Sequence, residues 1–92
     1  MRFPEGAPVF AVEVRSENDY GPAAEQAMQE KRADYFACGT LVVWDVELLS
    51  EDVIKSYTAS APDQPMIFRH RDIADAAPAV PGWWMPVDEL FR

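Results

Sequence analysis

Glu13 is the first residue whose type and position suggest chemistry. It lies within the apolar run PVFAVEV, where a carboxylate costs free energy unless it is exposed, paired or bound to a metal. Arg15, two residues later, falls on the same face of an extended chain. The simplest alternative to a reactive carboxylate is therefore an ion pair between these two side chains at a sheet edge, worth about 1 kcal/mol or less if exposed.

Lys31 is a second candidate, on a predicted helix that follows the first strand. An ammonium group directed toward a strand carboxylate can orient a phosphate or a water molecule. The competing interpretation is a lysine whose stem crosses apolar surface while its charge stays at the rim. Convergence of Glu13 and Lys31 on one cavity would favour catalysis over this alternative.

Five further polar or aromatic positions carry weaker signals. Asp45 and Glu47 share a strand face near the strand's carboxyl end, where α/β sheets tend to place ligands, although a solvated rim explains them equally simply. His70 lies between two arginines, which is typical of a surface residue, and we assign it no role. Trp83 and Trp84 either cap a small core or present an aromatic surface, and in an extended segment their rings point in opposite directions.

The elements that must position these residues begin with a strand over residues 9–15. Pro22 suits a first helical turn and Gly39 suits the residue after a last turn, so we expect one helix over residues 22–38. A dense β-branched and aromatic run at 40–47 is typical of a strand that is covered on both faces. This order predicts a βαβ unit with two parallel strands.

The rest of the chain is predicted to turn back on this unit. Residues 53–58 alternate as in a half-exposed antiparallel strand, and residues 66–69 extend the meander. The prolines of residues 76–81 disfavour regular structure there. The terminal VDELF fits a short helix whose Leu90 and Phe91 dock on the core. The predicted fold class is mixed α/β.

Composition limits the organisation and the partners of this chain. Its 92 residues, predicted to form a single domain over 1–92, carry 8 Lys and Arg against 16 Asp and Glu, for a net charge of -8. This acidity argues against a large electrostatic footprint on nucleic acid. Cys38 cannot form an internal disulfide alone, and there is no apolar run of transmembrane length, so we expect a cytoplasmic protein with no membrane association. So small a core favours oligomerisation.

Several linked motifs resemble one family. PVFAVEVRSENDYG, EKRADYFACGTLVVWDVELL, VIKSYTA and AVPGWWMPVDELF follow one another over residues 8 to 91. In this order they resemble the Uma family of restriction-endonuclease-like proteins. The resemblance implies a restriction-endonuclease-like mixed sheet flanked by helices, here a β-α-β-β meander with a short C-terminal helix. It also implies a metal site of the PD-(D/E)xK type that hydrolyses phosphodiesters in DNA.

The family's site residues transfer only in part. By resemblance, Glu13 matches the second acidic position and would bind Mg²⁺ or Mn²⁺, Arg15 stands where many relatives of the fold have a lysine, and Lys31 matches a helix lysine that could replace it. These three are the predicted catalytic residues. The family's N-terminal half, with its YELIDGE-like segment and PD motif, has no counterpart here, and Val9 stands where many relatives have aspartate. The match therefore covers only the C-terminal half of such a domain.

Two functions follow as expectations. The first is a metal-dependent endonuclease domain acting on DNA, incomplete in this chain because one metal ligand is missing. The second is a non-catalytic dimerisation or protein-interaction module derived from the same fold. A sheet that lacks its first strands leaves an edge and apolar surface open, and a second copy would cover both, so we expect a homodimer.

Overall fold

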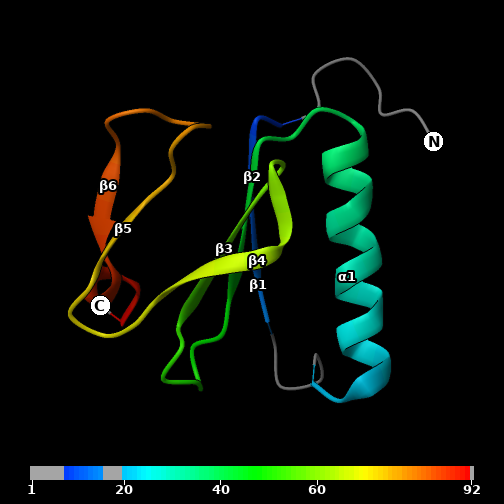
Figure 1. Ribbon diagram of the computed structural model, residues 1–92. Helices are drawn as coiled ribbons and strands as arrows, with labels where there is room; N and C mark the ends of the chain where they lie inside the picture. Colours follow the sequence, from blue (N-terminus) through cyan, green and yellow to red (C-terminus); the bar gives the residue numbers. More distant parts are fainter. Residues whose placement is uncertain (1–7, 16–19, 92) are drawn as a thin grey trace.

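The computed structural model describes residues 8–15 and 20–91, and Ser16, the last residue of the EVRS motif, lies outside them. These residues form three layers (Figure 1). A single helix covers one face of a four-stranded mixed sheet, and a C-terminal unit of two short strands and a helical turn lies beyond the other face. The mixed α/β class expected from the sequence is confirmed at this level.

The sheet has the order β1-β2-β3-β4. β1 (Phe10–Val14) and β2 (Val42–Val46) pair in parallel and are joined by α1 (Pro22–Ala37), so the predicted βαβ unit is confirmed. β3 (Ile54–Thr58) runs antiparallel to β2, and β4 (Ala61–Phe68) runs antiparallel to β3. Every residue of β2 is buried, as its continuous apolar pattern indicates.

The C-terminal unit departs from expectation in its detail. β5 (Ile73–Asp75) and β6 (Trp84–Pro86) form a separate two-stranded sheet, and η1 (Val87–Phe91) is a 3-10 helix at the predicted position of the terminal helix. The two strands were not expected, because three-residue strands have no periodicity to recognise. β4 also begins at Ala61, five residues before the expected start, despite two prolines in its sequence.

Glycines fix both ends of α1 close to the predicted bounds. Gly21 and Gly39 have φ values of 101° and 103°, which side-chain-bearing residues rarely adopt. Gly39 follows the C-cap residue Cys38 and donates its N–H to the carbonyl of Phe36. The helix therefore ends at Ala37, one residue before the expected end.

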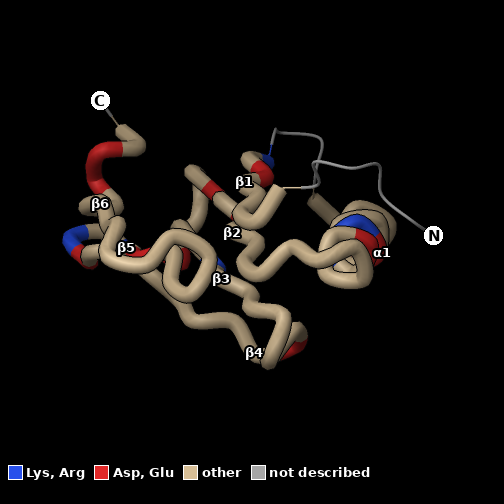
Figure 2. The backbone as a smooth tube through the Cα atoms, turned by 90° about the horizontal axis from the view of Figure 1, so that it is seen from above, with Lys and Arg blue, Asp and Glu red and all other residues tan. Residues whose placement is uncertain are grey.

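The C-terminal unit lies on the side of the sheet that is turned away from α1 (Figure 2), and the hydrophobic core lies between this unit and the sheet. It joins the sheet to the C-terminal unit, and its buried members are Val42, Trp44, Val46, Val53, Ile54, Phe68, Ala74, Ala76 and Val87. None of the 16 residues of α1, all within the described chain, is buried. The helix layer is therefore held mainly by contacts other than a packed apolar stripe. Among the described residues, no helix has the length and apolar character needed to cross a membrane.

Candidate functional site

Glu13 and Lys31 meet between β1 and α1. The Nζ atom of Lys31 lies 3.0 Å from Oε1 of Glu13, and the hydroxyl of Tyr35 donates a hydrogen bond of 2.9 Å to the same oxygen. That hydrogen bond, together with burial, raises the pKa of Tyr35 above its ordinary value of 10.0, because ionised Tyr35 would face a carboxylate. Tyr35 therefore stays a donor at neutral pH and fixes the orientation of Glu13.

A pocket of about 240 Å³ opens beside this pair. Helix residues Ala24, Ala27 and Met28 line it together with Glu13, Val14 and Lys31. The small alanine side chains leave space between the helix and β1, so the carboxylate and the ammonium group border a cavity large enough for a few water molecules or a phosphate group. The Lys31 side chain is 57% exposed, which leaves it accessible to a ligand.

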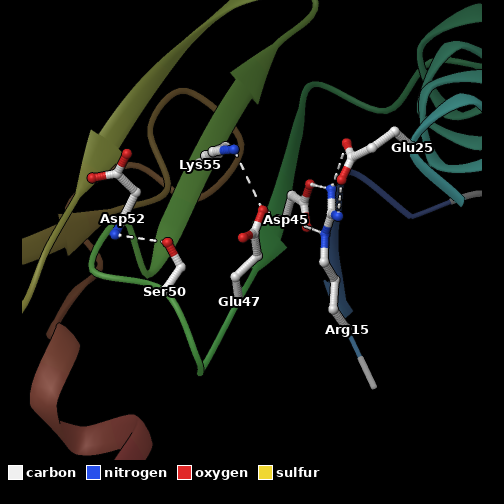
Figure 3. A network of polar contacts seen from close by, with 7 residues as sticks. All are labelled: Arg15, Glu25, Asp45, Glu47, Ser50, Asp52 and Lys55. Atoms are coloured by element: carbon white, nitrogen blue, oxygen red, sulfur yellow. Dashed lines mark hydrogen bonds and ion pairs between the residues drawn. The ribbon is translucent and has the colours of Figure 1, made fainter. Parts of the chain in front are cut away.

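Arg15 lies two residues beyond Glu13, just past the end of β1, in a different environment, a network of carboxylates (Figure 3). Its Nε and Nη2 atoms donate to the two oxygens of Asp45 at 2.8 and 2.7 Å, a bidentate arrangement that matches the planar guanidinium. Glu25 of α1 accepts further hydrogen bonds from the same guanidinium, one of them at 3.0 Å. Glu47 lies 3.5 Å from Nε and also contacts Lys55 at 3.4 Å.

Charge pairing favours the ionised forms of Arg15 and Glu25. The hydrogen bonds that Arg15 donates to Asp45 and then to Glu25 raise its pKa above the ordinary value. The hydrogen bond from Arg15 lowers the pKa of Glu25 below its ordinary value of 4.5. Because Glu25 is on α1 and Arg15 directly follows β1, this ion pair also fastens the helix to the sheet.

Two simpler interpretations of the sequence are wrong. The expected ion pair between Glu13 and Arg15 is replaced by separate partners for each residue, because Lys31 and Tyr35 reach Glu13 from the helix while Asp45 reaches Arg15 from β2. A solvated rim was the simpler explanation considered for Asp45 and Glu47. Both are buried, and they balance the charge of the Arg15 guanidinium.

Glu13 does not form a complete divalent-metal site within the described chain. Over residues 8–15 and 20–91, no group of three or more His, Cys, Asp or Glu side chains is placed to hold a metal ion. One oxygen of Glu13 already accepts from Tyr35 and contacts Lys31. Mg²⁺ binding usually combines one or two protein carboxylates with waters and substrate phosphates, so ligands beyond Glu13 would be required.

The remaining candidates lie away from this pocket. His70 is exposed, as expected, and its Nδ1 lies 3.1 Å from Asp88. The ring of Trp83 contacts the rings of Phe10 and Trp44 in tilted arrangements, with ring centroids 6.2 and 5.8 Å apart. Trp83 is still 41% exposed. Trp84 is 58% exposed, so neither tryptophan is buried, although the two differ in their contacts.

Sequence reasoning assigned no role to two residues of these sites. Tyr35 follows Lys31 by four positions, a spacing that places both on one side of a helix, and this signal could have identified it. Glu25 lies in the first turn of the helix, and its long side chain reaches Arg15 from there. No periodicity indicates that contact.

Comparison with models of known protein families and with curated proteins finds no match.

Proposed function

We propose that this chain is a nuclease-like domain that hydrolyses phosphodiester bonds of DNA, with Glu13 and Lys31 as its catalytic residues. The observation that carries the proposal is the 3.0 Å contact between these side chains at the edge of the pocket between β1 and α1. A carboxylate and an ammonium group on one cavity are a pair that can act on a phosphodiester and a water molecule together.

Each residue has a distinct part in this proposal. Lys31 would attract a non-bridging phosphate oxygen and stabilise the negative charge that develops on it. Glu13 would accept a proton from the attacking water as the new phosphorus–oxygen bond forms and the bond to the leaving oxygen breaks. Tyr35 would hold Glu13 in position. Arg15, whose side chain is 1% exposed, is better placed to support β1 than to contact substrate.

Mg²⁺ or Mn²⁺ is the expected cofactor by the resemblance to the Uma family, since the candidate ligands are oxygens. The restriction-endonuclease-like meander belongs to the same proposal. It is supported by the parallel pair β1 and β2, with Glu13 near the end of β1 and Lys31 on the connecting helix.

The test is plasmid cleavage by the full chain with Mg²⁺, with Mn²⁺ and with EDTA. We expect cleavage with at least one metal, and a loss of at least about 100-fold in Glu13→Gln, because general acid–base groups contribute roughly 10²–10⁴-fold. Lys31→Ala should also be slower. Glu30→Gln, an equal charge change on the exposed side of α1, should cleave like the unaltered chain.

Two results would refute the hydrolase. One is that the unaltered chain cleaves with neither metal. The other is that Glu13→Gln cleaves as fast as Glu30→Gln. Circular dichroism and a urea titration of each variant separate lost chemistry from lost folding.

A second candidate function, a non-catalytic interaction module, is favoured by a different observation. Large apolar side chains are exposed along β1 and around the start of β6, and Val12, Val14, Trp83 and Trp84 are among them. Failure of the cleavage test together with self-association in solution would support this function.

A further inference from the structure

β1 forms one edge of the four-stranded sheet. Just before β1, the carbonyl of Val9 accepts a hydrogen bond of 2.8 Å from the N–H of Leu41. Just after β1, the N–H of Arg15 donates a hydrogen bond of 3.0 Å to the carbonyl of Val46. Backbone groups of successive strand residues point alternately to the two sides, so the odd-numbered residues bond to β2. Phe10, Val12 and Val14 therefore direct their N–H and C=O groups to the side where no described strand lies.

The side chains along this edge are apolar and accessible. Val12 is 48% exposed and Val14 is 56% exposed, on the face where Phe10 packs against Trp44 with ring centroids 5.0 Å apart. An open row of backbone groups beside exposed valines is a typical site of strand addition.

The opposite edge of the sheet is protected. β4 contains Pro62 and Pro65, which lack N–H donors, and Asp63 between them. Prolines and charges on an edge strand are the usual devices that prevent pairing with another chain. β1, with the sequence FAVEV, has no proline and therefore offers the edge that can pair.

We propose that two copies of this chain pair through β1, antiparallel and about a twofold axis at Val12, so that their two sheets become one. In this register Val12 faces the partner's Val12, and Phe10 faces the partner's Val14. Each such pair exchanges two backbone hydrogen bonds, for about six in all. A shift by two residues would leave one outward-facing residue of each strand without its pair, and a shift by one would oppose the two faces of the sheet.

Charge selects the same register. Glu13 then lies opposite the partner's Ala11, whereas a two-residue shift toward the end of β1 would place Glu13 directly opposite the partner's Glu13. Directly opposed like charges destabilise a strand pair. Because each copy carries a net charge of -8, long-range repulsion opposes the dimer, and added salt should strengthen it.

The dimer has a consequence for the pocket, which rests on the hydrolase proposed above. On the helix side of the joined sheet, the partner's Glu13 is the diagonal neighbour of Glu13. Diagonal neighbours on adjacent antiparallel strands lie roughly 7–8 Å apart. A second copy would thus bring a further carboxylate toward the pocket of the first. The dimer itself does not depend on cleavage and is measured separately.

Sedimentation equilibrium of the full chain between 1 and 100 µM, at low and high NaCl, measures the dimer directly. All samples carry Cys38→Ser to prevent unrelated disulfides, with the Cys38 chain measured beside them. We expect a dimer that tightens with salt. Val12→Lys should weaken it at least tenfold. The matched control is Met66→Lys on the opposite edge, where Met66 is 63% exposed, and it should dimerise like the unaltered chain.

Oxidation of single-cysteine variants tests the register. Val12→Cys should form a disulfide-linked dimer, since directly paired residues have Cα atoms about 5.5 Å apart, within disulfide range. Val14→Cys faces the partner's Phe10 and should link poorly. A monomer at 100 µM, an effect of Met66→Lys as large as that of Val12→Lys, or linking of Val14→Cys as efficient as that of Val12→Cys would each overturn the proposal. The cysteine pair keeps the test valid if Val12→Lys does not fold.

Discussion

At the scale of single residues, each charged side chain between α1 and the sheet is stabilised by a specific oppositely charged partner. Arg15 and Asp45 are both buried, and their bidentate contact replaces the hydration that each loses on folding. A buried charge is tolerable when it is paired and becomes very costly when its partner is removed. Arg15 is therefore a structural requirement of the strand that carries Glu13.

Replacement of Arg15 by methionine should accordingly destabilise the fold. Arg15→Met leaves Asp45 buried without its guanidinium, for which we expect a loss of roughly 3–5 kcal/mol in the free energy of unfolding. Urea titration followed by circular dichroism measures it. Glu25→Gln is the matched control, because its carboxylate is more than half exposed, and it should cost less than about 1 kcal/mol. Equal losses in both variants would contradict this account.

The sequence could identify Glu13 and Lys31 because each breaks a local pattern, one in an apolar strand and the other on a helical stripe. It could not identify the partners of Arg15. Asp45 reaches Arg15 across a parallel strand pair, and Glu25 reaches it from the helix, so both contacts depend on tertiary register rather than on spacing along the chain. The same dependence explains why a solvated rim was as simple an explanation of Asp45 and Glu47 as any other from the sequence.

At the scale of elements, α1 is attached to the sheet by polar contacts. Glu25 pairs with Arg15, Lys31 pairs with Glu13, and the guanidinium of Arg32 lies 3.8 Å from the ring centroid of Tyr57. The helix bounds were predictable from Pro22 and Gly39. Its weak apolar attachment was not, because alanines and Met28 at helical spacing look like a core stripe whether or not they are covered.

This attachment predicts a helix that loosens in acid. The pKa of Glu25 is lower in the folded state than its ordinary value of 4.5, so ionised Glu25 stabilises the folded state above about pH 4.5. That contribution is lost as the pH falls through the lowered pKa. The groups facing it are Arg15 and, by longer-range attraction, Lys55 and Arg32.

Hydrogen exchange between pH 6 and pH 3 checks the prediction. Protection factors of α1 amides should fall on acidification before those of β2, whose residues are all buried. In Glu25→Gln, protection of α1 should be lower at pH 6 and should change less with pH. Simultaneous loss of protection in α1 and β2, with no difference between the two chains, would show that Glu25 does not hold the helix.

At the scale of the whole molecule, stability and the candidate site occupy opposite faces of the sheet. The parallel unit and the returning strand β3 were predictable, because alternation and β-branched runs are local signals. The position of the core was not, since Ala74, Ala76 and Val87 lie in a segment with little periodicity and are buried only after β5 pairs with β6. The face of the sheet toward α1 does not contribute to this core and carries charged side chains.

This division predicts which substitutions matter for folding. Val87→Ala, at a position with 0% exposure, removes two buried methyl groups and leaves a cavity, for which we expect a loss of roughly 2 kcal/mol. Met28→Ala removes a longer side chain, but Met28 is only partly buried and borders the pocket, so it should cost less than about 1 kcal/mol. Urea titration of both variants at pH 7 gives the comparison. If Met28→Ala proved the more damaging, α1 rather than the C-terminal unit would supply the main packing of the sheet.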